Sequence, residues 1–532
     1  MLKHRKSRAL AGMASVAVAA LALVGCTTGG GSDPDAEAVY VEAIAEDPVS
    51  MNGQLVSSPT VQRFSLAMLD TLVGINTDYE IFPKLAESWE FSDDGLQVTF
   101  HLHEDVSWHD GEPFSSEDVV FNFEEIMPLQ SFGPAMLAKI DSVEAPDANT
   151  VVLTMNGAYG PLLPTLALQF ILPKHIYEGT DYATNPANMA PVGTGPMMFD
   201  HFSSGEEVVL VKNPDYYRGD VQVDRAIYPI MTDPNTRMLS LVNGELDQAS
   251  VDPSQLDQIE SNADLVHLEG GYFPQAIQIM MNSENEYLSD PVVRKAVYSA
   301  IDREQIVEVA LSGLGEVATG FFPPSLGWAV DPGVDFSADY PFDIDAVNAT
   351  LDEAGYPAGS DGTRFTLRML YINTLTDTQA AAELAKSTLA DVGINLELES
   401  TTSAAFIEQI YTNNDFDLAN LRSTVSADPS LGIARWYVCN PDRVGARNPS
   451  SICDSVIDDA AAGALSVATQ EERAEFFYEM QERSNELFFV APYAWTNASF
   501  PTVNTSRWDG LTELDAETAS GDINWLTMTF TG

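Results

Sequence analysis

The sequence is poor in positive charge. Lys and Arg together number 25 in 532 residues, against 79 Asp and Glu, and the formal net charge is −54. Proteins that bind nucleic acid or anionic lipid through charge need clustered cations, so this composition argues strongly against both functions. Hydrophobic residues make up 45% of the chain, which is enough for large cores. The length predicts about two to four domains.

Cysteine and histidine are scarce as well. Three cysteines exclude a disulfide-rich small-protein fold, and all seven histidines lie at or before His267. His101 and His103 share one face of a predicted strand, and His109 lies in a predicted turn. No neighbouring cysteine or fourth histidine completes a closed metal site, so a polar strand face and a structural turn are favoured. We predict neither a metal nor a cofactor.

Motifs of nucleophilic and phosphate chemistry are missing. The sequence has no G-x-S-x-G elbow, and Gly193–Pro196 (GTGP) lacks the Lys-Ser/Thr that completes a phosphate-binding loop. Paired carboxylates carry no information in a chain with 79 acidic residues. We therefore assign no catalytic residue and expect a protein that is not an enzyme.

A long apolar run occurs at the N-terminus and nowhere later in the sequence. A basic start precedes an apolar stretch over 9–24 that is short for a membrane span and typical of a signal peptide. The stretch ends in Leu23-Val24-Gly25-Cys26, which resembles a bacterial lipobox. That resemblance implies a signal peptide over 1–25 and a lipid on the Cys26 thiol; a buried or reactive cysteine after an ordinary signal peptide is the alternative. Residues 26–38 would then be a lipidated cysteine and flexible tether, anchoring an exported protein to the outer face of the cell membrane.

The body of the chain has the pattern of an α/β protein. Alternating apolar residues predict strands at 96–102, 151–155 and 208–211, and Ser289-Asp290-Pro291 opens a predicted helix. Strand and helix then alternate over 365–421. The predicted elements there are strands at 365–371, 394–398 and 416–421, and helices at 378–392, closed by Gly393, and at 403–411. This order predicts a mostly parallel sheet covered by helices, with a ligand site beyond the carboxyl ends of the strands.

Two of the three cysteines lie close together. Cys439 and Cys453 are separated by 13 residues that include two Asn-Pro pairs and a glycine. In an exported protein this spacing favours a disulfide that closes a polar surface loop. Two free thiols are the alternative.

A series of motifs in fixed order resembles family 5 of the solute-binding proteins, the peptide- and nickel-type binding proteins of ABC importers. The resemblance covers about residues 40–512, and it departs from the family at His103, where the family usually has Arg. The matching segments are Pro83–Gly95 (PKLAESWEFSDDG), Val98–Leu102, Trp108–Phe114 (WHDGEPF), Asp118–Phe121, Val192–Pro196, Lys212–Gly219 (KNPDYYRG), Asn243–Asp247, Asp290–Ala296, Ala300–Arg303, Leu351–Tyr356 and Glu471–Arg473.

The resemblance implies a two-lobed α/β fold like that of the periplasmic binding proteins, of type II and of the large peptide-binding subclass, with a hinge and an interlobe ligand cleft. Lobe I would hold residues 39–275 and lobe II residues 276–499, and residues 500–532 would return to lobe I. It further implies a monomer that captures a small molecule or peptide by closing on it. The closed form would then dock on the permease subunits of an ABC transporter.

The ligand class depends on one segment. Peptide-binding relatives carry an Asp, in a Gly-Trp-x-x-Asp-like segment, that pairs with the peptide amine. Aligned on Asp428-Pro429, that position falls near Val425 here, and the Trp position falls near Arg422. Either Asp428 supplies the missing charge, or Arg422 binds an anionic end of the ligand. A salt bridge with one of the many acidic residues is the alternative for Arg422. We expect an oligopeptide or a peptide-like compound.

Six further residues are candidates for the pocket wall. They are Ser57, Ser58 and Thr60, which match an early loop that lines the pocket in relatives, and Tyr371, Asn373 and Trp436. A solvated loop is the alternative for the first three, and core packing for the two aromatic residues. Competing functions are the same fold with a sugar, an opine-like compound or a metal chelate as ligand, a secreted hydrolase, and a sensory lipoprotein.

Overall fold

The computed structural model of the protein describes residues 37–56, 58–76, 78–251, 255–259, 261–268, 273–496, 501–512 and 523–532. Residues 37–531 belong to one unit. The expected signal peptide and the lipidated Cys26 lie outside the described residues, as does Ser57. None of the helices in the described ranges is long and apolar enough to cross a membrane.

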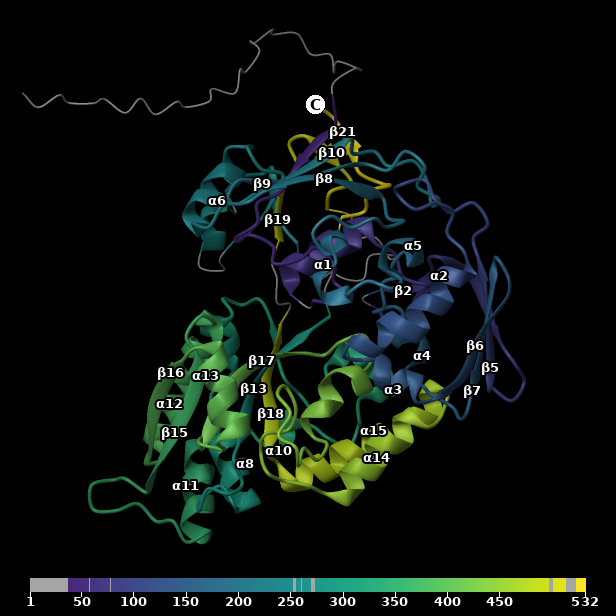
Figure 1. Cartoon of the computed structure of the whole chain (residues 1–532). Helices are drawn as coiled ribbons and strands as arrows, with labels where there is room; N and C mark the ends of the chain where they lie inside the picture. Colours follow the sequence, from purple (N-terminus) through teal and green to yellow (C-terminus); the bar gives the residue numbers. More distant parts are fainter. Residues whose placement is uncertain are drawn as a thin grey trace, which may run out of the picture. The chain divides into compact units, whose positions relative to one another are not determined.

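The first two sheets bring the start and the end of the described chain together. β1 (Val39–Val41) pairs in parallel with β10 (Arg225–Pro229), and β9 (Glu207–Lys212) and β8 (Met197–Ser203) follow as antiparallel neighbours (Figure 1). In the second sheet β19 (Pro501–Asn504) lies between β11 (Gln248–Ser250) and β12 (Leu265–His267). Tyr40 packs edge-on against Trp508 and Trp525, so the C-terminal residues contact the N-terminal part. The lobe boundaries given above remain a prediction.

A third sheet confirms the predicted strands at 96–102 and 151–155. Its order is β4 (Ala86–Phe91), β5 (Gln97–Leu102), β7 (Thr150–Met155) and β6 (Ile140–Asp147), all antiparallel. Val98, Phe100 and Leu102 alternate into the core, as the sequence pattern predicts. Further elements of this half are the hairpin β2 (Val73–Ile75) and β3 (Ile81–Pro83), the pair β20 (Trp508–Asp509) and β21 (Thr529–Phe530), and the helices α1 (Pro59–Met68), α2 (Ser116–Phe121), α3 (Gly133–Leu137), α4 (Leu162–Leu166), α5 (Lys174–Tyr177), α6 (Pro234–Val242) and α7 (Leu256–Ile259).

The largest sheet contains the alternating strands of residues 365–421, but it is mixed and not mostly parallel. β15 (Phe365–Ile372) pairs in parallel with β16 (Ile394–Thr401) and with β17 (Leu418–Thr424). β13 (Gln275–Met281) and β18 (Val490–Thr496) join them as antiparallel strands, with β14 (Glu316–Val317) at the edge. Helical crossovers connect only β15, β16 and β17, whereas β13 and β18 enter from distant parts of the chain. The predicted parallel arrangement is therefore right for three strands and wrong for the other three.

The helices around this sheet begin and end close to where the sequence predicts. α8 (Pro291–Ser299) starts where the Asp290 carboxylate accepts a hydrogen bond from the Val292 amide. α12 (Thr376–Asp391) is followed by Gly393 at a φ of +74°, a backbone conformation that favours glycine. The remaining α-helices of this half are α9 (Arg303–Gln305), α10 (Phe336–Asp339), α11 (Ile344–Glu353), α13 (Ser403–Ile407), α14 (Ser455–Leu465) and α15 (Gln470–Leu487).

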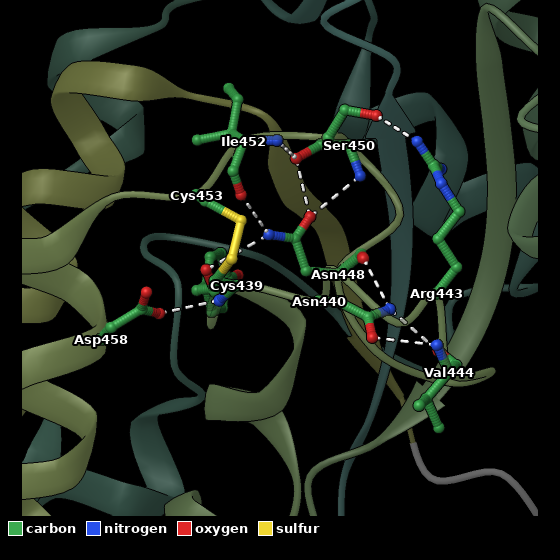
Figure 2. Close-up of a disulfide and its surroundings, with 11 residues drawn as sticks. Cys439, Asn440, Arg443, Val444, Asn448, Ser450, Ile452, Cys453 and Asp458 are labelled. Atoms are coloured by element: carbon green, nitrogen blue, oxygen red, sulfur yellow. Dashed lines mark hydrogen bonds between the residues drawn. A yellow bond between two sulfur atoms is a disulfide. The ribbon is translucent and has the colours of Figure 1, made fainter.

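The disulfide joins Cys439 and Cys453 in the structure (Figure 2). The Cys439 amide donates to the Asp458 carboxylate at 2.8 Å, which ties the loop to α14. The Asn448 side chain accepts from Ser450 and donates to the Ile452 carbonyl, so it organises the loop from inside. A cross-link that closes a loop of this size stabilises a fold by about 3 kcal/mol in the chain-entropy model.

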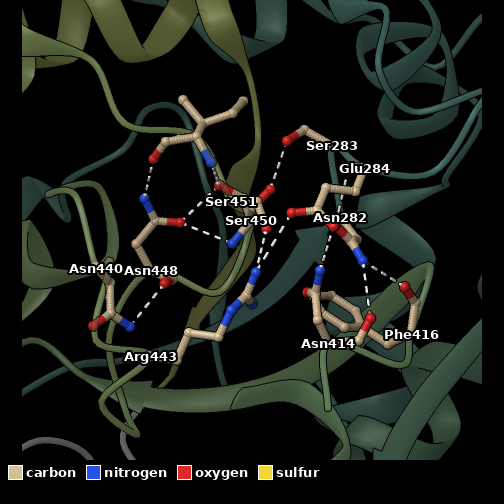
Figure 3. A network of polar contacts seen from close by, with 11 residues as sticks. Asn282, Ser283, Glu284, Asn414, Phe416, Asn440, Arg443, Asn448, Ser450 and Ser451 are labelled. Atoms are coloured by element: carbon tan, nitrogen blue, oxygen red, sulfur yellow. Dashed lines mark hydrogen bonds and ion pairs between the residues drawn. The ribbon is translucent and has the colours of Figure 1, made fainter. Parts of the chain in front are cut away.

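The same loop is held against the end of β13. The Ser283 amide and hydroxyl both donate to the Ser450 carbonyl, at 3.0 and 2.7 Å (Figure 3). Arg443 donates to the Ser451 hydroxyl and lies 3.5 Å from the Glu284 carboxylate. The loop is therefore fixed at both ends and in its middle.

His109 has the structural role that the sequence favours over metal binding. Its Nδ1 accepts a hydrogen bond from the Gly193 amide at 3.1 Å, which leaves Nε2 to donate to the Gly195 carbonyl at 3.0 Å. The neutral imidazole thus joins two of the motifs named above, around Trp108 and around Thr194. Burial lowers the pKa of His109.

A pH dependence follows from that lowered pKa. The unfolded chain takes up a proton on His109 below about pH 6.5, whereas the folded protein resists it, so the free energy of unfolding should fall as the pH drops through this range. In His109→Gln this part of the slope should vanish, and lost hydrogen bonds should cost about 1–2 kcal/mol at neutral pH. Urea unfolding at several pH values measures both effects. His101→Gln, at an exposed position on β5, is the control, and an unchanged slope in His109→Gln would contradict this account.

Candidate ligand-binding site

The segment that follows β17 carries two of the residues that the sequence indicates, Asp428 and Trp436. Asp428 has a side chain only 3% exposed, and it caps the short 3-10 helix Pro429–Leu431 by accepting from the Ser430 amide at 2.9 Å. Its two oxygens also accept from the Arg473 guanidinium, at 2.7 and 2.6 Å. Because Arg473 already neutralises this carboxylate, the geometry does not support the expectation that Asp428 offers its charge to a ligand amine.

Arg422 is paired as well. It lies on β17, and its Nε donates to Asp377 Oδ2 at 2.9 Å, while Nη2 contacts the same oxygen. Asp377 is buried in the first turn of α12. The structure therefore places Arg422 in the salt bridge that was the alternative to ligand binding, with a helix residue as its partner.

The aromatic candidates are core residues. Trp436 is 3% exposed and Tyr371 is 8% exposed, and both belong to the hydrophobic cluster around the six-stranded sheet. Val425, near which the expected amine-pairing position falls, is fully buried in the same cluster, and its amide donates to the Pro274 carbonyl at 3.0 Å.

The polar candidates lie on separate elements. The Ser58 hydroxyl caps α1 by accepting from the Val61 amide, and Thr60 follows in the first turn of that helix. Asn373 is exposed just after β15, where its amide donates to the Thr401 carbonyl. No hydrogen bond between the described candidates joins these two places.

A chain of glutamines that sequence reasoning missed connects the early loop to the segment after β17. Gln54 Nε2 donates to Gln169 Oε1 at 2.8 Å, and Gln169 Nε2 donates to Gln130 Oε1 at 2.8 Å. The same Gln130 oxygen accepts from the Phe132 amide at 2.6 Å. The Arg435 guanidinium lies over the Phe132 ring, 5.4 Å from the ring centre. Gln54 and Gln169 are fully buried, so this chain is part of the scaffold, and only the tertiary fold brings it together.

Two further contacts run from the first half of the chain to the half that contains the six-stranded sheet. Tyr79, at the tip of the β2–β3 hairpin, has a positive φ of 65°, and its ring lies 5.2 Å from Phe273 and packs on the core of the six-stranded sheet. Burial raises the pKa of the Tyr79 hydroxyl. The Gly160 amide donates to the Leu465 carbonyl at 3.1 Å, close to Arg473. The sequence signal for the Tyr79 contact is weak: Asn76 and Asp78 are turn-forming residues just before it.

A cavity of about 480 Å³ lies elsewhere, between α2, β6 and α5. It contains none of the candidate residues, and its lining includes Glu117, Glu124, Glu125 and Glu178. Four carboxylates would repel an anionic solute. Within the described residues no cluster of His, Cys, Asp and Glu has the arrangement of a metal site.

Asp428 and Arg473 should matter for stability more than for ligand choice. Both side chains are 3% exposed, so Asp428→Asn leaves a buried guanidinium without its counter-charge and should lower the free energy of unfolding by about 3 kcal/mol. The matched control is Asp454→Asn, which also removes a helix-capping carboxylate from an ion pair, with the 34% exposed Arg483. That change should cost less than about 1 kcal/mol. Denaturant unfolding measures both, and equal losses would contradict the argument from burial.

Comparison with known proteins gives consistent results. The family model described as bacterial extracellular solute-binding proteins, family 5, middle, matches residues 80–443. Protein XP55 of Streptomyces lividans is 28% identical, over 96% of this chain and 92% of that protein. Di/tripeptide-binding protein 1 of Pseudomonas aeruginosa is 26% identical, over 82% of this chain and 86% of that protein. The periplasmic binding protein DppA of Helicobacter pylori, solved in complex with the peptide STSA, is 25% identical with a TM-score of 0.73, over 93% of this chain and 98% of that chain.

Proposed function

The chain belongs to the bacterial extracellular solute-binding proteins of family 5, and from this premise we propose that it captures an oligopeptide or a peptide-like solute for an ABC importer. The observation that carries the proposal is its likeness, over 93% of its length, to a binding protein solved with a peptide in place. A relative named for di- and tripeptides supports the same class of solute.

The mechanism is capture, closure and delivery. Lobe I consists of residues 39–275 and 500–532, and lobe II of residues 276–499. The solute contacts both lobes only in the closed form, so solute binding shifts the protein toward that form. The early loop before α1 and the segment after β17 supply the two walls. Permease subunits in the membrane recognise the closed form and receive the solute. The protein itself catalyses no reaction, and it works as a monomer.

The N-terminus holds the protein at the membrane. We propose cleavage after residue 25 and a lipid on Cys26, followed by a tether rich in Gly and Thr that lets the folded body reach the permease. Mass spectrometry of detergent-extracted protein should find a lipidated N-terminal Cys26. If the Cys26→Ala variant is processed and retained at the membrane as well as the wild-type protein, the lipid anchor is contradicted.

A second class of solute is favoured by one observation. The position expected to pair with a peptide amine falls near Val425, which is buried, and Arg473 neutralises the nearby Asp428. A solute without a free amine, such as an opine-like compound, a sugar or a metal chelate, needs no carboxylate there. Native mass spectrometry of the purified protein separates the two classes through the mass of the solute that copurifies.

Binding should appear as stabilisation without turnover. A solute that binds only the folded protein stabilises it by about 2.7 kcal/mol at a free concentration of one hundred times the Kd. We expect a rise in Tm with members of a library of two- to five-residue peptides, and the recovered peptides should be chemically unchanged. N-acetylated and free-amine members should be retained to a similar degree, because Val425 offers no charge. Steady conversion of a bound peptide, or no response to any member, would contradict the proposal.

A further inference from the structure

Arg435 differs from the other arginines that are withdrawn from solvent. Arg364, Arg473 and Arg507 each face a carboxylate, and Arg294 and Arg303 each donate to two or more backbone carbonyls. Arg435 is partly buried, and its recorded hydrogen bond is a long one of 3.5 Å from Nε to the Gly432 carbonyl. Among the described residues no Asp or Glu lies within 4.0 Å of its guanidinium.

A second positive charge lies beside it. The Asn448 amide donates to the Arg435 carbonyl at 3.3 Å, which brings Arg447 next to Arg435 in space. Arg447 is exposed and likewise has no ion-pair partner in the described part of the chain. Burial lowers the pKa of Arg435, and the charge of Arg447 adds to this effect. Two neighbouring cations without a counter-charge are unexpected in a chain with 79 acidic residues and 25 cations.

Arg435 lies at a position in the fold where a solute can bind. It lies on the 3-10 helix Ile433–Trp436, in the segment that follows the carboxyl end of β17. Sheets with parallel strands place ligands beyond such ends. The turn before this helix packs directly on the strand end, because a side chain at Gly432 would overlap the Val425 carbonyl. The guanidinium lies over the Phe132 ring, and the glutamine chain ties Phe132 to the early loop.

We propose that Arg435, with Arg447 beside it, binds a carboxylate of the captured solute. An uncompensated and partly desolvated guanidinium is costly in the free protein, and a carboxylate can satisfy its planar donors in pairs. This inference rests on the proposed function and deepens it: the protein selects solutes by an anionic end. For a peptide that end is the C-terminal carboxylate, and an acidic side chain is the other source of the same chemistry.

The test uses Arg435→Met, which keeps most of the apolar stem against Phe132 but removes the charge. Probes for calorimetry are tetra-alanine, its C-terminal amide, the amide of Ala-Ala-Glu-Ala, and glutarate as a carboxylate without peptide bonds. Arg435→Met should weaken tetra-alanine at least tenfold, which is about 1.4 kcal/mol, and leave its amide unchanged within twofold, since only the free carboxylate loses a desolvated charge pair. Arg435→Lys should bind tetra-alanine more tightly than Arg435→Met and less tightly than the wild-type protein. If the glutamate peptide amide is the one that weakens, the bound carboxylate is that of a side chain.

Arg443→Met is the matched control. Arg443 lies in the disulfide loop, so its replacement removes the same charge from the same region. Unlike Arg435, it has partners within the protein, Glu284 and Ser451 (Figure 3). It should leave the affinity for every probe unchanged. Equal weakening of tetra-alanine and its amide by Arg435→Met, or no change in any probe, would overturn the inference while the peptide function stands. If the wild-type protein binds no peptide but glutarate raises its Tm and Arg435→Met abolishes this rise, the peptide function fails and the carboxylate site stands.

Discussion

The buried ion pair between Asp428 and Arg473 is the constraint on which the segment after β17 depends. Taking two charges out of water is costly unless each satisfies the other, and here both carboxylate oxygens are matched by the guanidinium fork. The pair links the end of a central strand to α15, and the Gly160 amide from the first half of the chain docks close to it. The course of the following turn, and with it the position of Arg435, is set from this point.

The shortage of cations gives each of them a recognisable role. With 25 Lys and Arg against 79 acids, a carboxylate is rarely far from a guanidinium, and most described arginines have an obvious partner. Electrostatic self-repulsion of the acidic surface favours solubility and opposes nonspecific association with anionic solutes. Against that background, a cation without a partner in the described structure is informative, and it marks a place where an anion from outside the protein would be stabilised. The acidic cavity near α2 has the opposite character.

Local patterns in the sequence predicted the elements well where the pattern is itself the physical cause. The alternation of Val98, Phe100 and Leu102 produces a half-buried strand because side chains point to opposite faces at every step. Asp290 and Gly393 mark helix ends because one supplies a missing acceptor and the other adopts a left-handed backbone. The orientation of β13 and β18 was not predictable, since no local signal specifies which strand a distant segment pairs with.

The sequence by itself determined the family, the acidic character, the strands and helices of residues 365–421, and the pair of cysteines that the structure joins. These features are encoded in composition, in spacing or in ordered motifs, so they can be recognised without coordinates. Only the tertiary structure decided the state of the charges at the candidate site. Asp428 and Arg422 are compensated by Arg473 and Asp377, each 45 positions away along the chain, and Arg435 lies against Phe132. A side chain's availability to a ligand depends on what packs beside it, and that is fixed by contacts between segments that are far apart in sequence.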